Sequence, residues 1–87
     1  MDYFPVGATG DFTIYAHCGV QFIQVDGVTW RTRLHDDGNG NAPPWPSDAF
    51  RGNITRPSVD RVFYTSPSLP LERLVFRPAP DARYMCA

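Results

Sequence analysis

The stretch VQFIQVDGVTWRTRL, from Val20 to Leu34, decides the fold expected for this chain of 87 residues. Two runs rich in β-branched and aromatic residues flank Asp26-Gly27, and an Asp-Gly pair between such runs is a strong signal for a β-hairpin. The tight turn needs positive φ at both central residues, which glycine adopts freely and aspartate tolerates. The sequence therefore predicts a β-hairpin over residues 20–34.

The two-residue turn also predicts the register of the hairpin, because cross-strand pairs are counted outward from it. Ile23 is expected opposite Trp30, and Phe22 opposite Arg31 on the other face, where the ring can receive the guanidinium. Val20 is expected opposite Arg33. The side chains expected on the core face are Ile23, Val25, Val28, Trp30 and Leu34.

Continued past the hairpin, this register sets Cys18 opposite His35 and His17 opposite Asp36. His17 and Cys18 cannot pair with each other in a regular strand, because neighbouring side chains point to opposite faces. A thiol–imidazole pair of Cys18 and His35, with arginines on the same face to lower the thiol pKa, is one hypothesis for a thiol-reactive site. A metal site formed by His17, Cys18 and His35 is another. The ordinary alternatives are a cysteine buried for packing and a bulge at Gly19 that breaks the register.

Shorter apolar runs predict the other strands of the fold. They cover residues 12–18, 50–55, 61–65 and 72–77, with the second and third joined as a hairpin around residues 57–60. Residues 48–51 fit at most one turn of helix. Short strands separated by turns predict an all-β single domain over residues 1–87, a small antiparallel barrel or sandwich of five to six strands.

Composition and charge narrow the classes of partner. The net charge is −1, so no basic stripe favours nucleic acid. No window approaches the ~20 apolar residues of a membrane span, and the beginning of the sequence lacks a signal-peptide pattern, so we expect a cytoplasmic protein without a membrane partner. In that compartment Cys18 and Cys86 are expected as free thiols. All eight basic residues are arginine, which fits either codon bias in a high-GC genome or a surface built for carboxylates and phosphates.

Catalytic motifs are missing from the sequence. There is no phosphate loop, no nucleophile elbow and no carboxylate pair, and Glu72 is the only glutamate. Residues 37–48 have roughly the oxygen spacing of a calcium loop, but Ala42 stands where such a loop needs glycine. We therefore expect no enzyme, no cofactor and no resident metal.

The long loop over residues 35–50 carries the proline-flanked Trp45. Loops of this length are usually functional, so Trp45 either anchors a partner protein or folds back over the open end of the barrel. The candidate partner-binding residues are Trp45, Phe50, Arg31 and Arg33. The leading hypothesis is a non-enzymatic accessory module that binds another protein. An alternative is a structural subunit of a larger assembly, such as a phage particle, in which exposed strand edges pair with neighbours.

Several short sequence strings are spread over most of the chain: HCGV from His17, TWR from Thr29, DGN from Asp37, and VFRP from Val75, with Cys86-Ala87 at the end. In this combination the sequence resembles a group of small uncharacterised all-β proteins of high-GC actinobacteria or their phages. The resemblance implies no activity and transfers no functional residue.

Overall fold

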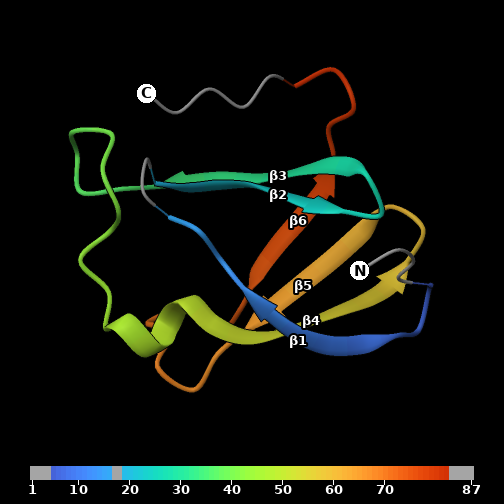
Figure 1. The fold of residues 1–87 in the computed structure, drawn as a ribbon, viewed down its shortest axis with the longest axis horizontal. Coiled ribbons are helices and arrows are strands. Elements are labelled where there is room, and N and C mark those ends of the chain that lie inside the picture. The colour runs from blue at the N-terminus through green and yellow to red at the C-terminus, as the bar shows by residue number, and fades with distance from the viewer. Residues whose placement is uncertain (1–4, 17–18, 83–87) are drawn as a thin grey trace.

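The computed structural model describes residues 5–16 and 19–82 as a curled sheet of six strands (Figure 1). In chain order the elements are β1 (Thr9–Thr13), β2 (Val20–Val25), β3 (Val28–His35), the 3-10 turn η1 (Ser47–Phe50), β4 (Arg51–Ser58), β5 (Arg61–Thr65) and β6 (Leu74–Pro78). Every strand is antiparallel to its neighbours, in the order β1-β4-β5-β6-β3-β2. The expected all-β class is confirmed, and the barrel is open rather than closed.

The β2–β3 hairpin forms around the predicted turn. Asp26 and Gly27 have φ of 56° and 72°, as this turn requires. Ile23 pairs with Trp30 and Phe22 pairs with Arg31, which confirms the register next to the turn.

Farther from the turn the predicted register is wrong. Val20 pairs with His35 instead of Arg33, because an irregularity follows Val20 and shifts the ladder before Phe22. Gly19, directly before β2, has a φ of +101°, which glycine adopts far more readily than other residues. The physical reason for the error is that a bulge adds residues to one strand only, so counting from the turn fails beyond it.

Three side chains of the hairpin differ from their predicted burial. Val20 is only 1% exposed, although the predicted register had placed it on the outer face. Leu34 and Val28 were expected in the core and are instead 46% and 37% exposed. Val20 and Leu34 lie within the irregular part of the hairpin, where the strict alternation used for the prediction does not apply. Val28 keeps its predicted partner, Val25, and lies directly after the turn.

The first strand lies earlier in the chain than residues 12–18. β1 pairs with β4 from Thr9↔Thr55 to Thr13↔Arg51 and ends where β4 begins. One further bond, from the Ile14 N–H to the Phe50 carbonyl at 2.8 Å, holds the chain as it leaves the sheet. An apolar run cannot by itself show where its partner strand stops, so the prediction began and ended too late.

The remaining elements agree with the sequence. β4 and β5 form the second hairpin, β6 covers most of the last predicted strand, and η1 supplies the single helical turn. A second irregularity between Thr55 and Ser58 bends β4.

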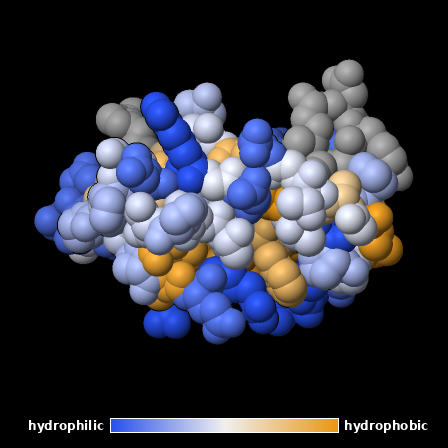
Figure 2. All heavy atoms as spheres, turned by 90° about the horizontal axis from the view of Figure 1, so that it is seen from below, coloured by the Kyte–Doolittle hydropathy of each residue, from blue (hydrophilic) through white to orange (hydrophobic). Residues whose placement is uncertain are grey.

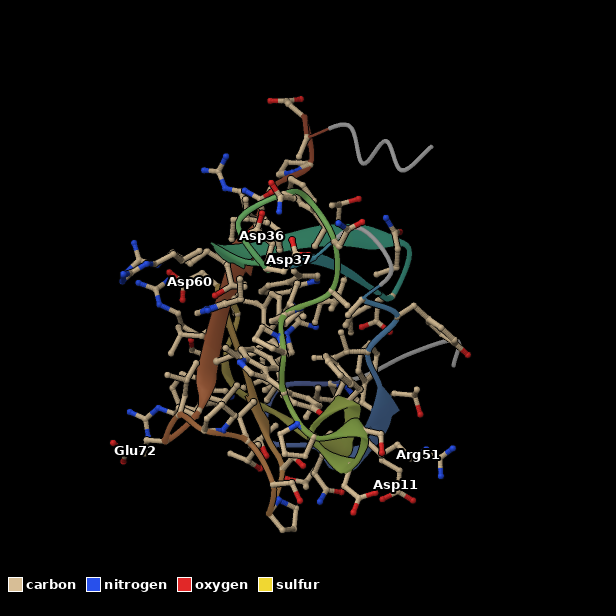
Figure 3. All side chains as sticks on the ribbon, turned by 90° about the vertical axis from the view of Figure 1, so that its left-hand side faces the viewer. Asp11, Asp36, Asp37, Arg51, Asp60 and Glu72 are labelled. Atoms are coloured by element: carbon tan, nitrogen blue, oxygen red, sulfur yellow. The ribbon has the colours of Figure 1, made fainter. Side chains whose placement is uncertain are left out.

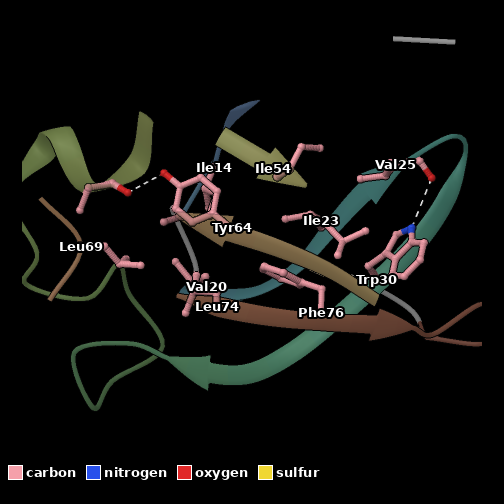
Figure 4. Close-up of a cluster of buried hydrophobic side chains, with 13 residues drawn as sticks. Ile14, Val20, Ile23, Val25, Trp30, Ile54, Tyr64, Leu69, Leu74 and Phe76 are labelled. Carbon is pink, nitrogen blue, oxygen red and sulfur yellow. Dashed lines mark hydrogen bonds between the residues drawn. The ribbon is translucent and has the colours of Figure 1, made fainter. Parts of the chain in front are cut away.

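The core fills the concave side of the sheet (Figure 4). Its largest fully buried side chains are Trp30, Tyr64, Phe76, Ile54, Leu74, Val20 and Val62. The polar atoms of the two largest are satisfied: Tyr64 Oη donates to the Ala49 carbonyl at 2.6 Å, and Trp30 Nε1 donates to the Val25 carbonyl at 3.4 Å. This core joins the two hairpins into one packed unit.

Candidate functional site

The open side of the barrel holds the larger of two hollows described here. β1 and β2 stand at opposite ends of the strand order, so neither pairs with the other among the described residues. Between them lies a cleft of about 510 Å³, which we call the edge cleft. Its lining residues are Asp11, Phe12, Thr13, Tyr15, Phe22, Ile23, Gln24, Val25 and Asp26. The volume is within the range of sites that take small ligands or peptide side chains, roughly 300–1,000 Å³.

The edge cleft offers apolar side chains from both of its walls. Phe12 on β1 is half-buried and packs against the core, while Ile23 on β2 belongs to the core itself. Tyr15, which follows β1, is 84% exposed at the rim. In the view from below, the exposed apolar side chains form small separate groups on a largely polar face (Figure 2). A bound segment could therefore bury apolar side chains in this cleft.

The edge of β2 lacks the usual protection against strand pairing. Its sequence, VQFIQV, contains no charged residue and no proline, whereas β1, TGDFT, carries Asp11. Natural edge strands are commonly guarded by such residues or by bulges. The irregularity of the β2–β3 ladder lies between Val20 and Phe22, with the extra residues on β3, so the half of β2 from Ile23 to Val25 stays regular. In a hairpin with a two-residue turn the backbone groups of Gln24 point away from β3, toward the free edge.

A second hollow, of about 370 Å³, gathers three arginines on the outer side of β3 and β6. We call it the arginine hollow. It is lined by Gln21, Arg31, Thr32, Arg33, Val75, Arg77 and Pro78. Among the described residues, β3 and β6 pair at two positions, Trp30↔Pro78 and Arg31↔Arg77. The hollow lies beside these two pairs, since Arg31, Arg77 and Pro78 line it. The predicted residues Arg31 and Arg33 thus come together with Arg77, which the sequence did not single out because its pairing with β3 is not local.

Trp45 and Phe50 lie elsewhere, at the end of the barrel. The Trp45 ring stacks on Phe50 with centroids 5.8 Å apart and an interplanar angle of 23°, and it contacts the His35 ring at 5.4 Å. Both residues are half-buried and pack against the core. This packing agrees with the fold-back alternative for Trp45, and the role of Trp45 as a partner anchor stays a prediction. Arg31 and Arg33 line a different part of the surface, the arginine hollow.

His35 is half-buried at the end of β3. Burial is the main cause that lowers the pKa of His35, and the positive charge of Arg33 lowers it further. Its strand partner is Val20, so the register that placed it opposite Cys18 does not hold. His17, Cys18 and Cys86 lie outside the described residues. The thiol and metal hypotheses therefore stay predictions, and the predicted register no longer supports the pairing of His35 with Cys18. Within residues 5–16 and 19–82, no three His, Cys, Asp or Glu side chains gather as a metal site would need.

The two aspartates after β3 accept hydrogen bonds from the backbone of their own loop. Asp36 accepts hydrogen bonds from the backbone N–H groups of Gly38 and Gly40, at 3.2 and 3.0 Å. Asp37 accepts from the Asn39 N–H at 2.8 Å, and this bond is the main cause that lowers the pKa of Asp37. Both carboxylates face inward on the same loop (Figure 3). They act as turn acceptors, which is the arrangement of a structural loop.

Comparison of the chain with protein-family models, curated proteins and solved structures gave no significant match. The resemblance to actinobacterial and phage proteins therefore stays a prediction. Among the described residues no helix is long and apolar enough to cross a bilayer.

Proposed function

We propose that this protein is a non-enzymatic binding module that takes an extended segment of a partner protein onto the outer edge of β2, which pairs with no other strand than β3 among the described residues. The observation that carries the proposal is an edge strand without charge or proline beside an apolar cleft. Backbone hydrogen bonds to the outward groups of β2 would supply affinity. Side chains that enter the edge cleft would supply specificity.

The geometry defines the chemistry of the segment. A strand added beside β2 alternates its side chains between the two faces of the sheet. On the concave face they would lie beside Ile23 and Phe12, which favours β-branched or aromatic residues at every second position. Those between them face solvent and can be polar. The partner segment should therefore be extended, apolar at alternate positions and uncharged at its centre.

Selection of displayed random nonapeptides on the immobilised full chain tests this chemistry. We expect enrichment of apolar residues at positions i, i+2 and i+4. Enrichment at the helical spacing i, i+3 and i+4, or no enrichment, would contradict strand addition.

A matched pair of variants then tests the role of the backbone. Gln24→Pro removes the outward N–H, and Gln24→Ala removes only the side chain, with its 2.6 Å bond to Thr29 Oγ1. For the best selected peptide we expect Gln24→Pro to weaken binding about 10-fold and Gln24→Ala to leave it within about twofold, by fluorescence anisotropy. Equal losses in the two variants would show that the side chain, not the edge, binds the peptide.

The same edge supports a second candidate, a structural subunit that pairs with further copies of itself. An exposed strand without charges is a template for such pairing. Light scattering on a size-exclusion column separates the two functions. Self-association that rises with concentration and is lost in Gln24→Pro would favour the assembly subunit, whereas a monomer at all concentrations favours the peptide-binding module.

A further inference from the structure

We infer that the arginine hollow binds a phosphate group, either free or carried by a small organic molecule. The site lies on β3 and β6, away from the lining of the edge cleft, and does not depend on the proposed strand addition.

Three guanidinium-bearing residues line one hollow from two strands. Arg31 and Arg33 lie two apart on β3 and both line the hollow, and Arg31 is the direct cross-strand partner of Arg77. All three residues are exposed. A guanidinium offers planar pairs of N–H donors that match two oxygens of a phosphate. Arginines from two strands can therefore contact different oxygens of one tetrahedral anion.

The positive charge of the hollow is not neutralised by the described residues. The ion pairs described in the structure are Arg56–Asp26 and Arg61–Asp60, and neither residue pair lines the hollow. Like charges placed directly opposite on neighbouring strands repel each other, as Arg31 and Arg77 must. The field also extends beyond the hollow, since Arg33 helps to lower the pKa of His35. A bound dianion would remove a repulsion that the free protein retains.

The rest of the lining suits a phosphate with a small organic part. Gln21 and Thr32 add neutral polar groups, and Val75 and Pro78 add an apolar wall. A volume of about 370 Å³ is near the lower end of small-molecule sites, roughly 300–1,000 Å³. The hollow is thus large enough for more than one phosphate group but not for an extended ligand.

Charge favours a phosphate over a carboxylate or a nucleic acid. A carboxylate brings one negative charge to three cations, whereas a phosphate monoester carries about −1.5 to −2 at neutral pH. A nucleic acid needs a wide basic surface. This chain has nine acidic and eight basic residues, so it lacks a general attraction for polyanions.

The test titrates the full-length, isotope-labelled chain with phenyl phosphate, inorganic phosphate and benzoate, followed by NMR. The ionic strength is held at about 0.15 M, so that general charge attraction is screened. We expect saturable shifts centred on the Arg31, Thr32 and Arg77 signals with both phosphates, and benzoate at least about 10-fold weaker. Tighter binding of phenyl phosphate than of inorganic phosphate would assign the organic molecule as the ligand, and equal binding would assign free phosphate.

Three variants with the same change in charge localise the site. Arg31→Gln and Arg77→Gln should each weaken phosphate binding by about 10-fold or more, because each removes charge-assisted hydrogen bonds. Arg51→Gln is the control, since Arg51 is exposed at the start of β4, near η1 and away from the hollow (Figure 3). It should change the affinity less than about twofold. Circular dichroism checks that each variant is folded.

Four results would overturn the inference. They are the lack of saturation by about 10 mM of either phosphate, an equal loss of affinity in Arg51→Gln, benzoate binding as tightly as phenyl phosphate, and a short oligonucleotide binding at least about 10-fold more tightly than either phosphate.

Discussion

Arg56 of β4 connects the first half of the sheet to the turn of the β2–β3 hairpin, and its removal is expected to destabilise the whole fold. Its Nη1 lies 3.4 Å from Asp26 Oδ2, and its Nη2 donates to the Val59 carbonyl at 3.1 Å. The guanidinium carbon also lies 5.3 Å from the centroid of the Trp30 ring, in a cation–π contact. One side chain therefore bridges elements that share no strand pairing.

The burial of the pair sets the expected magnitude. The side chains of Arg56 and Asp26 are 17% and 16% exposed. Removal of one partner costs about 3–5 kcal/mol in a fully buried pair and about 0–1 kcal/mol in an exposed one. For Arg56→Met, which keeps much of the apolar stem, we expect a loss of about 2–3 kcal/mol. A chain of this length is typically stable by about 4–13 kcal/mol, so the loss is a large fraction of the total.

Urea unfolding, followed by tryptophan fluorescence, measures the loss. A double-mutant cycle with Asp26→Asn isolates the pair, since asparagine tolerates the positive φ of this position. We expect a coupling energy of about 1–2 kcal/mol, between the values for exposed and buried pairs.

Arg61→Met is the control, because the Arg61–Asp60 distance is shorter, 3.0 Å, while the side chains are 31% and 65% exposed. It should leave the unfolding midpoint unchanged. A coupling below about 0.5 kcal/mol for Arg56–Asp26, or an equal shift in Arg61→Met, would refute the reasoning from burial.

Three further changes test other parts of the fold. Gly52→Ala should lower the free energy of unfolding by about 2 kcal/mol or more, measured in urea, because an added Cβ would clash with the Thr65 carbonyl oxygen across the β4–β5 ladder. Gly38→Ala is the control: an added Cβ meets no atom there, and its positive φ of +93° alone should cost about 1–2 kcal/mol. Equal costs in the two variants would argue against the clash. Tyr64→Phe should cost about 1–2 kcal/mol by thermal unfolding, since the buried Ala49 carbonyl loses its 2.6 Å hydrogen bond; an unchanged Tm would show that the bond does not stabilise the fold. The pKa of His35 is lowered in the folded state, so the unfolded chain binds more protons as the pH falls through about 6.5, and the free energy of unfolding should decrease over that range. His35→Gln should flatten this part of the plot of stability against pH. An unaltered slope would assign the effect to other groups.

The sequence predicted those parts of the fold that depend on neighbours along the chain. Asp26-Gly27 specified a turn that needs positive φ, and the pairs Ile23–Trp30 and Phe22–Arg31 followed by counting. The irregularity between Val20 and Phe22 could not be counted, because the turn specifies only the pairs next to it. The close approach of Gly19 to residues 34–36 is equally invisible to a count from the turn. A Cβ at Gly19 would lie 3.1 Å from the Leu34 side chain and 3.2 Å from Asp36 and the His35 carbonyl.

The candidate sites were less predictable, because both depend on contacts between distant strands. Arg31 and Arg33 stood out in the sequence, but Arg77 joined them only through the pairing of β6 with β3. The edge cleft needs β1 and β2 at opposite ends of one sheet, which no local pattern encodes. Trp45 stood out in the sequence, but the contact of its ring with Phe50 depends on how the loop folds and could not be predicted.

The long separation between β1 and its partner has a consequence for folding kinetics. Thr9 and Thr55 are 46 residues apart, whereas β2–β3 and β4–β5 are each joined by a turn of two residues. Short hairpins form in about 1–10 μs, but closing a long loop costs entropy before its contacts can compensate. We therefore expect β1 to join the sheet after the folding transition state. Weakening the Thr9–Thr55 pair should speed unfolding and leave the folding rate almost unchanged, so β1 governs how long the native protein survives rather than how fast it forms.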